Sequence, residues 1–180
     1  MRQAKKLLSE RQVLVDGRFV SDSGFPVGLM DAISFPRMNQ TFQMVFRSGR
    51  LVARPIQDGS TKLLRIMDKR AVKGGRVQLN LHDGSNYLIV KEEDRFRVGD
   101  TLRLKVPARQ MDGFLKLEKG ATCYIFRGKH SGQVAVLDGM LEREGSKKTE
   151  AKLTSGEHEI ITLKDYLFVV DPQFKVTSAP

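Results

Sequence analysis

Three side chains that can bind a phosphate stand close together in one short loop: Arg127, Lys129 and His130. The loop separates two runs, 121–126 and 133–137, in which apolar and polar residues alternate as in half-buried strands. Glycines at both ends of the loop permit positive φ angles and a close approach of the backbone. Such a hairpin tip can hold backbone N–H groups and cationic side chains against a phosphate. An ordinary glycine-bounded hairpin with a solvated lysine fits the same residues.

Other basic residues stand beside predicted turns or on the predicted N-terminal helix, where their side chains can reach a polyanion. They are Arg47, Arg50, Lys73 and Arg76 in the middle of the chain, and Lys5, Lys6, Arg11 and Arg18 near its start. Arginine is favoured for phosphate because its planar guanidinium binds two oxygens at once. A solvated charged face would contain the same residues, so each of them is a candidate contact.

The charge of the chain favours a polyanionic partner. The formal net charge is +10 and the pI is about 9.9, a balance common in nucleic-acid-binding proteins, although a merely basic soluble protein shares it. Residues 36–113 carry +8 of this excess. Aromatic residues make up only 7% of the chain, with no tryptophan, so a platform for stacking single-stranded bases is not indicated. We therefore expect recognition of the backbone and shape of a folded RNA.

The residue types that support catalysis are scattered. The histidines fall in different parts of the chain without metal-ligand spacing, and there is no nucleotide-binding P-loop pattern. Glu92, Glu93 and Asp94 could hold a metal ion, but successive acidic residues more often form a solvated face. Cys123, the single cysteine, lies in an apolar strand pattern and is predicted to be a core side chain. The sequence thus predicts no catalytic residue, no metal and no cofactor.

The sequence also indicates the compartment. It contains no apolar run of about 18 residues that could cross a bilayer. Its first residues lack the apolar core of a secretory signal, and a single cysteine cannot form an intramolecular disulfide. We expect a cytoplasmic protein that does not contact membranes.

The first 35 residues predict a small unit made of a helix and a hairpin. Apolar residues spaced i, i+3, i+4 indicate a helix over Met1–Ser9, which starts without an N-cap, as if the chain began inside an element. Asp16-Gly17, between the short runs 12–15 and 18–20, indicates a hairpin with a type I′ turn. A segment rich in glycine, proline and serine leads to the apolar run Leu29–Phe35.

Residues 41–106 predict strands throughout. The runs assigned to strands are Phe42–Phe46, Leu51–Ala53, Val77–Leu81, Tyr87–Val90 and Thr101–Val106. Lys62–Val72 fits a helix face as well as a strand, and we favour a strand because a Gly-Gly turn leads directly into the next run. Pro107 cannot donate a ladder hydrogen bond, so the strand before it should end there or lie at an edge.

The part of the chain from Phe114 onward predicts the basic hairpin and two further strands, Glu159–Leu163 and Tyr166–Val170. Between the hairpin and these strands, the charged segment 142–152 predicts a mobile surface hairpin or loop. Residues 172–180 lack a core pattern and are expected to fray.

The stretch Lys116–Leu141 resembles the KOW motif of ribosomal proteins and of transcription elongation factors of the NusG/Spt type. The matching residues are Gly120, Gly128, Gly132 and Val134–Leu137, and many members carry a further glycine where this chain has Ala135. The resemblance implies a C-terminal SH3-like barrel.

The beginning of the chain resembles the back half of the RNA-binding module named after bacterial small-subunit ribosomal protein four. The matching residues are Leu7-Leu8, Val13-Leu-Val-Asp-Gly17, Asp31 and Ile33, and the first helix of that module has no counterpart here. The resemblance implies that the basic residues of this segment face RNA.

The whole order of parts is similar to one family, the archaeal and eukaryotic-type small-subunit ribosomal protein four (the e family). Further matching segments are Phe25–Asp31, Lys73–Gly84, Val98–Asp100 and Leu163–Val169. The resemblance implies a mainly β fold with a small α+β N-terminal part. Its expected divisions are a partial ribosomal-protein-four-like RNA-binding module at 1–35, a central β domain at 36–113, an SH3-like KOW barrel at 114–172 and a tail at 173–180.

This resemblance implies a structural, non-enzymatic component of the small ribosomal subunit. Its partners would be small-subunit ribosomal RNA and neighbouring ribosomal proteins, and off the ribosome it would be a monomer. One alternative is a KOW-containing transcription elongation factor, although residues 36–113 do not resemble the α/β polymerase-binding domain of such factors. Another is an accessory part of an RNA-modifying enzyme, which would need a separate catalytic domain.

Overall fold

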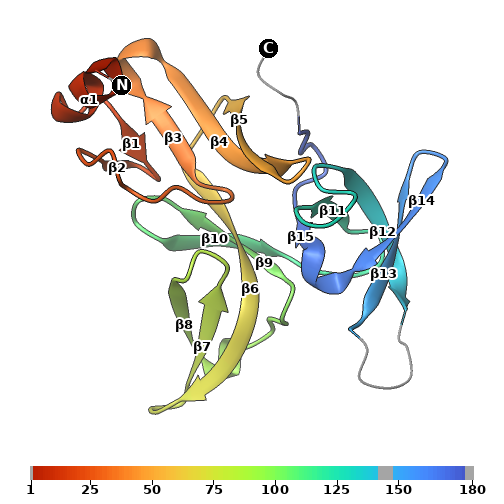
Figure 1. Ribbon diagram of the computed structural model, residues 1–180. Coiled ribbons are helices and arrows are strands. Elements are labelled where there is room, and N and C mark those ends of the chain that lie inside the picture. Colours follow the sequence, from red (N-terminus) through yellow and green to blue (C-terminus); the bar gives the residue numbers. More distant parts are fainter. Residues whose placement is uncertain (1, 142–147, 177–180) are drawn as a thin grey trace.

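Three antiparallel five-stranded sheets follow one another along the chain (Figure 1). The computed structural model describes residues 2–141 and 148–176. The strand orders are β2-β1-β3-β4-β5, β10-β9-β6-β7-β8 and β14-β13-β12-β11-β15. Within the described residues the one α-helix is α1 (Arg2–Ser9), where the sequence predicted it. No helix in this part of the chain is long and apolar enough to cross a membrane. The prediction of a mainly β fold with a small α+β N-terminal part is confirmed.

The first sheet is built from two tight hairpins and a connecting strand. Its strands are β1 (Leu14–Val15), β2 (Arg18–Phe19), β3 (Ala32–Phe35), β4 (Gln40–Arg47) and β5 (Arg50–Ile56), with the short 3₁₀ helix η1 (Pro36–Met38) between β3 and β4. Asp16 and Gly17 have φ angles of 48° and 75°, and Ser48 and Gly49 have 49° and 75°. Positive φ at both central positions is the requirement of a type I′ turn. The hairpin predicted at Asp16-Gly17 is confirmed, and the predicted strands Phe42–Phe46 and Leu51–Ala53 form a second hairpin.

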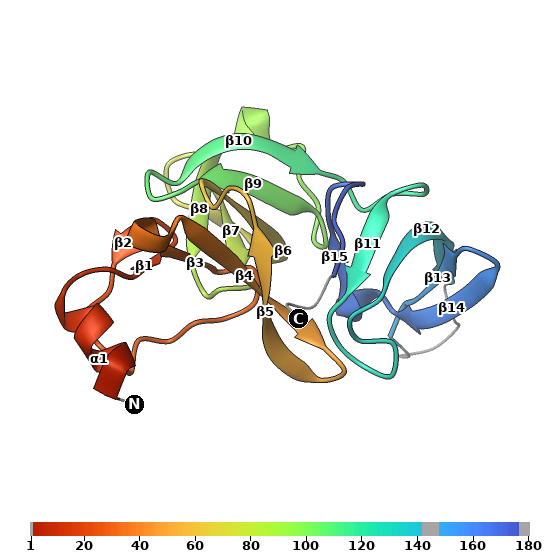
Figure 2. The ribbon, with the colours of Figure 1, turned by 90° about the horizontal axis from the view of Figure 1, so that it is seen from above.

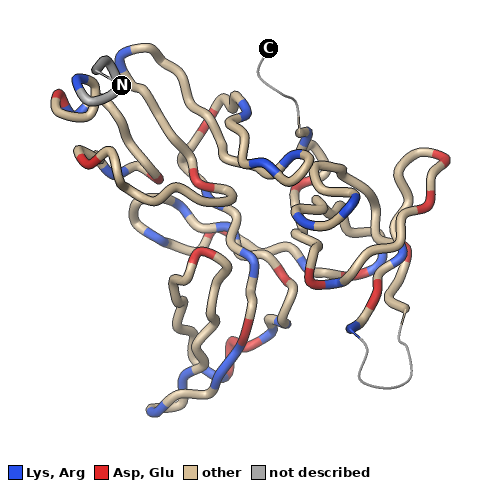
Figure 3. Tube along the Cα trace, in the orientation of Figure 1, with Lys and Arg blue, Asp and Glu red and all other residues tan. Residues whose placement is uncertain are grey.

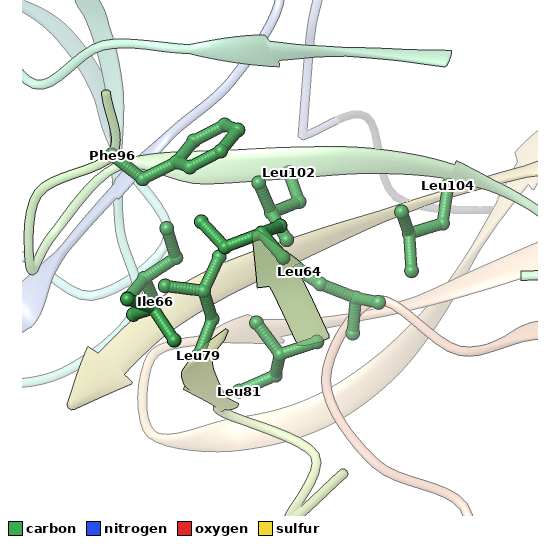
Figure 4. Packing of buried hydrophobic residues seen from close by; sticks show 9 residues of the cluster. Leu64, Ile66, Leu79, Leu81, Phe96, Leu102 and Leu104 are labelled. Atoms are coloured by element: carbon green, nitrogen blue, oxygen red, sulfur yellow. The ribbon is translucent and has the colours of Figure 1, made fainter. Parts of the chain in front are cut away.

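The second sheet is organised around one long strand. Its strands are β6 (Thr61–Val72), β7 (Arg76–Leu81), β8 (Asn86–Val90), β9 (Thr101–Lys105) and β10 (Gln110–Leu115), with η2 (Lys91–Glu93) after β8. The first part of β6, Thr61–Arg65, pairs with β9, and the rest pairs with β7 after a bulge at Met67. The strand interpretation of Lys62–Val72 is therefore confirmed. The core of this sheet gathers side chains from β6, β7 and β9 (Figure 4), among them Leu64, Leu79 and Leu102.

The third sheet contains the predicted basic hairpin. Its strands are β11 (Thr122–Ile125), β12 (Val134–Leu141), β13 (Glu150–Ser155), β14 (His158–Leu163) and β15 (Leu167–Val169), with η3 (Lys164–Tyr166) before β15. β11 pairs with β12, and the loop between them has positive φ at Gly128 (81°) and Gly132 (98°). Cys123 is fully buried, as predicted, and burial raises the pKa of its thiol to about 12. The loop glycines thus have the backbone role that the sequence assigned to them.

Two strands escaped prediction. β10 was missed because Gln110–Leu115 contains an aspartate and a glycine, and its register with β9 shifts beside that glycine. β13 begins at the C-terminal end of the segment expected to be a mobile surface hairpin or loop. Glu150–Lys152 pair with both β12 and β14, so this end belongs to a hairpin within the sheet and not to a loop. Positions 142–147 of the same prediction lie outside the described residues.

The predicted fraying of the C-terminal end is also wrong for residues 173–176. Phe174 is buried, with its ring centroid 5.4 Å from that of Tyr124 and the Arg54 guanidinium 3.9 Å above the ring. Arg54 also donates to the carbonyl oxygen of Lys175, and Val176 packs against the same cluster. A single aromatic residue near a chain end carries no periodic signal, so the sequence could not show this anchor. Residues 177–180 lie outside the described part.

The predicted domain boundaries do not coincide with sheet boundaries. The boundary after residue 35 falls between β3 and β4, which pair with each other, and the boundary after residue 113 falls inside β10. Hydrogen bonding between strands does not decide which segments fold independently. The division into units at 1–35, 36–113 and 114–172 therefore stays a prediction.

β6 lies where the three sheets meet. Leu64 and Ile66 belong to the core of the second sheet, whereas Leu63, on the opposite face, packs in a junction core with residues of the other two sheets. That junction core includes Val45 of β4 and Phe168 of β15. Seen from above (Figure 2), β4, β5 and β6 lie beside β15 at the centre of the molecule. The first half of β6, residues 62–66, is therefore buried on both faces.

A buried lysine joins the first sheet to the second. The Lys62 ammonium, on a residue only 6% exposed, lies 2.6 Å from Asp31, 2.7 Å from Asp16 and 3.4 Å from Asp83. Burial opposes the charge of Lys62, but the hydrogen bonds and charges of Asp16 and Asp31 outweigh it and raise the pKa of the ammonium. Each carboxylate also accepts a backbone N–H. We call Lys62 and its three carboxylates the lysine cluster.

A buried histidine makes a second connection at the same place. The His82 Nδ1 accepts the backbone N–H of Arg65 (3.2 Å), which leaves Nε2 to donate to the Leu29 carbonyl at 2.9 Å. The edge of its ring meets Phe168, with centroids 5.0 Å apart. Burial lowers the pKa of His82, although the hydrogen bond that its ring donates to the Leu29 carbonyl opposes this effect. His82 is thus a neutral structural group that touches all three sheets.

Replacing Lys62 by methionine tests the lysine cluster, because methionine keeps most of the volume and removes the charge. Three part-buried carboxylates are then left without their cation, and we expect a loss of about 3–5 kcal/mol in the free energy of unfolding. Urea unfolding monitored by circular dichroism measures this loss. The control is Lys105→Met, whose exposed ammonium lies 3.4 Å from Asp112 and should contribute less than about 1 kcal/mol. Equal losses in the two variants would show that the cluster has no special role.

Candidate nucleic-acid interface

The β4–β5 turn lies directly against the loop between β11 and β12. The Ser48 N–H donates to the Ser131 carbonyl at 3.2 Å, and the Tyr124 hydroxyl donates to the Phe46 carbonyl across a separation of 78 residues. A Cβ on Gly132 would lie 3.2 Å from the Cα of Arg47. The close backbone approach predicted for the loop glycines is therefore made to another turn of the same protein.

This contact brings five of the predicted binding residues onto one surface. Arg47 and Arg50 flank the turn, and both are exposed. Arg127 and Lys129 are exposed on the neighbouring loop, where His130 is half-buried. Figure 3 shows the basic segments of the turn and the loop next to each other. We call these five residues the junction basic surface.

The cations of the junction basic surface are available to a ligand. None of the ion pairs between described residues involves its arginines or its lysine. The Arg127 guanidinium lies 5.5 Å from the centroid of the Phe126 ring, a contact that orients the side chain and leaves its donors free. Basic turns held side by side in this way can bind successive phosphates of a folded nucleic acid.

A buried arginine adds positive charge beneath this surface, and the sequence interpretation missed it. Arg65 of β6 is 2% exposed; its Nη1 lies 2.8 Å from the Met67 sulfur, and its Nε has no hydrogen-bond partner among the described residues. Burial lowers the pKa of Arg65, the charge of Asp165 opposes that effect, and the nearby charge of Arg127 adds to it. The sequence signal that could have revealed Arg65 is a charged residue inside the apolar run of a predicted strand.

The other predicted residues lie elsewhere on the molecule. Lys73 and Arg76 are exposed at the β6–β7 turn, at the far end of the second sheet from α1 (Figure 3). Arg11 and Arg18 are exposed near the N-terminal hairpin, and the Lys6 ammonium lies 3.9 Å from Glu10. Lys5 belongs to α1, but its side chain lies outside the described part. The predicted set thus divides into the junction basic surface and two separate basic regions.

A groove of about 690 Å³ between the second and third sheets carries further cations that prediction missed. Arg95 and Lys116 lie 4.9 and 5.9 Å from the centroid of the Phe114 ring. Lys119 is exposed on the same groove, beside Gly120. These residues come from two different loops, so only the folded chain brings them together.

Groups that could support catalysis or hold a metal ion are dispersed. The described residues contain no cluster of three or more histidine, cysteine, aspartate or glutamate side chains with the geometry of a metal site. Glu92 and Glu93 are exposed, in agreement with a solvated face, whereas Asp94 is half-buried and lies 2.6 Å from the Lys69 ammonium. The chemistry that this arrangement offers is binding of anions by fixed cations.

Sequence comparison places this arrangement in a family. The model of "Ribosomal family S4e" matches residues 38–111, and that of "S4 domain" matches residues 1–33. The chain is 37% identical to "Small ribosomal subunit protein eS4" of Methanothermobacter thermautotrophicus, over 99% of this chain and 74% of that protein. The protein of the same name from Methanocaldococcus jannaschii is 39% identical, over 94% of this chain and 72% of that protein. The chain belongs to the eS4 family.

A solved structure of an eS4-family protein has the same fold. The crystal structure of the 30S ribosomal protein S4e from Thermoplasma acidophilum superposes with a TM-score of 0.82 at 28% identity, covering 98% of this chain and 89% of that one. Family membership confirms the resemblance drawn from the sequence motifs. The KOW assignment of residues 116–141 stays a prediction, because the segments matched by the two family models end at residue 111.

Replacing Gly132 by alanine tests the contact between turn and loop. Gly132 combines a φ of 98° with a neighbouring backbone 3.2 Å from the added Cβ, so we expect a loss of about 2–4 kcal/mol in unfolding free energy from strain and overpacking together. The control is Gly156→Ala, with a φ of 62° and open space around the Cβ, which should cost about 1–2 kcal/mol from backbone strain alone. Urea unfolding of both variants checks the difference. A Gly132 variant no less stable than the control would mean that the turn and loop are not held together.

Proposed function

We propose that this protein is a structural component of the small ribosomal subunit and binds ribosomal RNA through phosphate and shape contacts. The observation that carries the proposal is the junction basic surface, in which two turns distant in sequence are held together with their cations unpaired. A rigid cationic surface matches the fixed phosphate spacing of a folded RNA better than mobile lysines would. The eS4 names of the relatives support the ribosomal assignment.

Three basic regions suit a footprint spread over the RNA rather than one deep site. The first includes α1 and the N-terminal hairpin, the second is the β6–β7 turn with Lys73 and Arg76, and the third is the junction basic surface. We infer that the residues of all three are the RNA contacts, with the units 1–35, 36–113 and 114–172 contributing in turn. The third unit would then be the predicted KOW barrel.

The alternatives are less well supported. A transcription elongation factor and an accessory part of an RNA-modifying enzyme share individual motifs with this chain, but the full-length similarity is to ribosomal proteins. Family membership supports a non-enzymatic role. The partners that we propose are small-subunit ribosomal RNA and neighbouring ribosomal proteins, at the ribosome in the cytoplasm, with the free protein a monomer.

Cofractionation tests the ribosomal assignment. The tagged protein should sediment with small ribosomal subunits on sucrose gradients and remain bound through washes at moderate salt, because many phosphate contacts dissociate together. An antibody against RNA polymerase on the same fractions provides the comparison. Sedimentation with polymerase instead of subunits would favour the elongation-factor alternative.

Neutralising two arginines tests the binding surface itself. Arg47→Gln/Arg127→Gln removes two phosphate ligands, so the salt dependence of binding to purified small-subunit RNA should flatten by about 1.4–1.8 in log K against log salt, with a weaker affinity. Filter binding over a range of salt concentrations measures both quantities. Lys105→Gln/Lys152→Gln is the matched control, because it removes the same charge from side chains already paired with Asp112 and Glu159. Identical slopes in the two double variants would place the RNA elsewhere.

A further inference from the structure

A groove of about 770 Å³ runs along β8; none of the proposed RNA-binding residues lines it, although Arg76 of the β6–β7 turn pairs with Val90 at one end of β8. Its walls are β8 itself, the segment 92–96 and Met111 of β10. β8 and β10 are the two edge strands of the second sheet. Figure 1 shows β8 on the outer side of that sheet, away from β11–β15. The groove therefore opens at the unclosed seam of a curled sheet.

The strand that lines the groove can accept a further strand. β8 pairs with β7 along its length and with no other strand of the described residues. An edge strand leaves one row of backbone N–H and C=O groups unpaired, which is a template for an extended segment. Leu88 and Val90, on the face away from the core, are 49% and 43% exposed. A partner strand with apolar residues at alternate positions would cover these two side chains.

The rim of the groove is acidic in a basic protein. Glu92 and Glu93 are exposed, and none of the ion pairs between described residues includes them. Asp94 is engaged by Lys69, and Arg95 is turned toward the Phe114 ring. The lining residues carry three acidic side chains and one basic side chain, whereas the whole chain has a net charge of +10. Among the lining residues the free charges are thus negative, and the exposed Lys91 lies beside them outside the lining.

We propose that β8 and its groove dock an extended, basic segment of a neighbouring protein by strand addition. The backbone of such a segment pairs with the open edge of β8, its apolar residues cover Leu88 and Val90, and its lysines or arginines face Glu92 and Glu93. An RNA backbone does not fit, because its phosphates would meet the acidic rim. A second copy of this chain does not fit either, because antiparallel pairing of two β8 strands centred on Leu88 would set Glu92 and Glu93 of each copy beside residues 83–84 of the other, which supply no cation.

The isolated protein and a synthetic peptide give the first test. The probe is a nine-residue peptide of alternating valine and lysine, and its counterpart alternates valine and glutamate. The valine–lysine peptide should slow hydrogen exchange at the amides of residues 86–90, whereas the valine–glutamate peptide should not. No slowing with the cationic peptide, or equal slowing with both peptides, overturns the proposal.

Matched variants separate the groove from general charge effects. Glu92→Lys/Glu93→Lys should weaken binding of the valine–lysine peptide at least about tenfold at low salt, because both rim charges are reversed. Glu118→Lys/Glu157→Lys reverses two exposed charges elsewhere and should weaken binding of this peptide by much less.

A second pair of variants tests the apolar contact. Leu88→Lys should also weaken binding, whereas Ile161→Lys, at an equally exposed position of the edge strand β14, should not. Equal effects in each matched pair contradict the proposed site.

The second test uses assembled subunits and rests on the proposed function. A photoreactive p-benzoylphenylalanine replaces Leu88, and cofractionation first shows whether the protein enters small subunits, which separates a failure of the ribosomal assignment from a failure of the docking site. In assembled subunits, irradiation should crosslink position 88 to a basic segment of another protein, identified by mass spectrometry. A crosslink to ribosomal RNA, a crosslink to a second copy of this chain, or no crosslink would overturn the proposal.

Discussion

The ion pairs between Lys62 and its three carboxylates are the interaction on which the arrangement of the sheets depends. An ammonium group taken out of water loses several kcal/mol of hydration, and only close carboxylates compensate for that loss. Asp16 and Asp31 come from the first sheet, whereas Asp83 and Lys62 come from the second. The first sheet can therefore not shift on β6 without leaving charges buried and unpaired. Apolar contacts tolerate small displacements, so this cluster gives the junction its unique geometry.

The position of β6 follows from the same constraint. Its side chains alternate, so that Lys62, Leu64 and Ile66 face the first and second sheets while Leu63 and Arg65 face the junction with the third. A strand buried on both faces normally carries only apolar residues. β6 instead carries two cations, one neutralised by the lysine cluster and one lacking a hydrogen-bond partner for its Nε. The charge of Arg65, which Asp165 and Arg127 both influence, lies near the junction basic surface and adds to the positive potential there.

Local sequence signals predicted the elements well and their assembly poorly. The type I′ turn at Asp16-Gly17, the strand over Lys62–Val72 and the loop glycines were predictable because each depends on neighbouring residues alone. The pairing of the β4–β5 turn with the loop before β12 was not, because a contact across 78 residues leaves no local pattern. Phe174 was missed for the same reason, since its partners Tyr124 and Arg54 lie on two different sheets. Arg65 was missed although an arginine inside an apolar strand run is a local signal. The predicted RNA contacts remain predictions, and the sequence could not show which of them share a surface.

The basic residues at the junction and the acidic residues beside β8 lie on different parts of the molecule because of where the sheets meet. At the junction, backbone hydrogen bonds and buried aromatic rings hold two basic turns together, so the repulsion between their cations is overcome in the folded protein before any RNA arrives. RNA binding then does not have to order these loops, so a loss of their conformational entropy does not weaken the affinity. At the outer edge of the second sheet no other strand covers β8, and the free charges there are acidic. The junction basic surface therefore attracts a polyanion, whereas the unpaired Glu92 and Glu93 disfavour one in the groove beside β8.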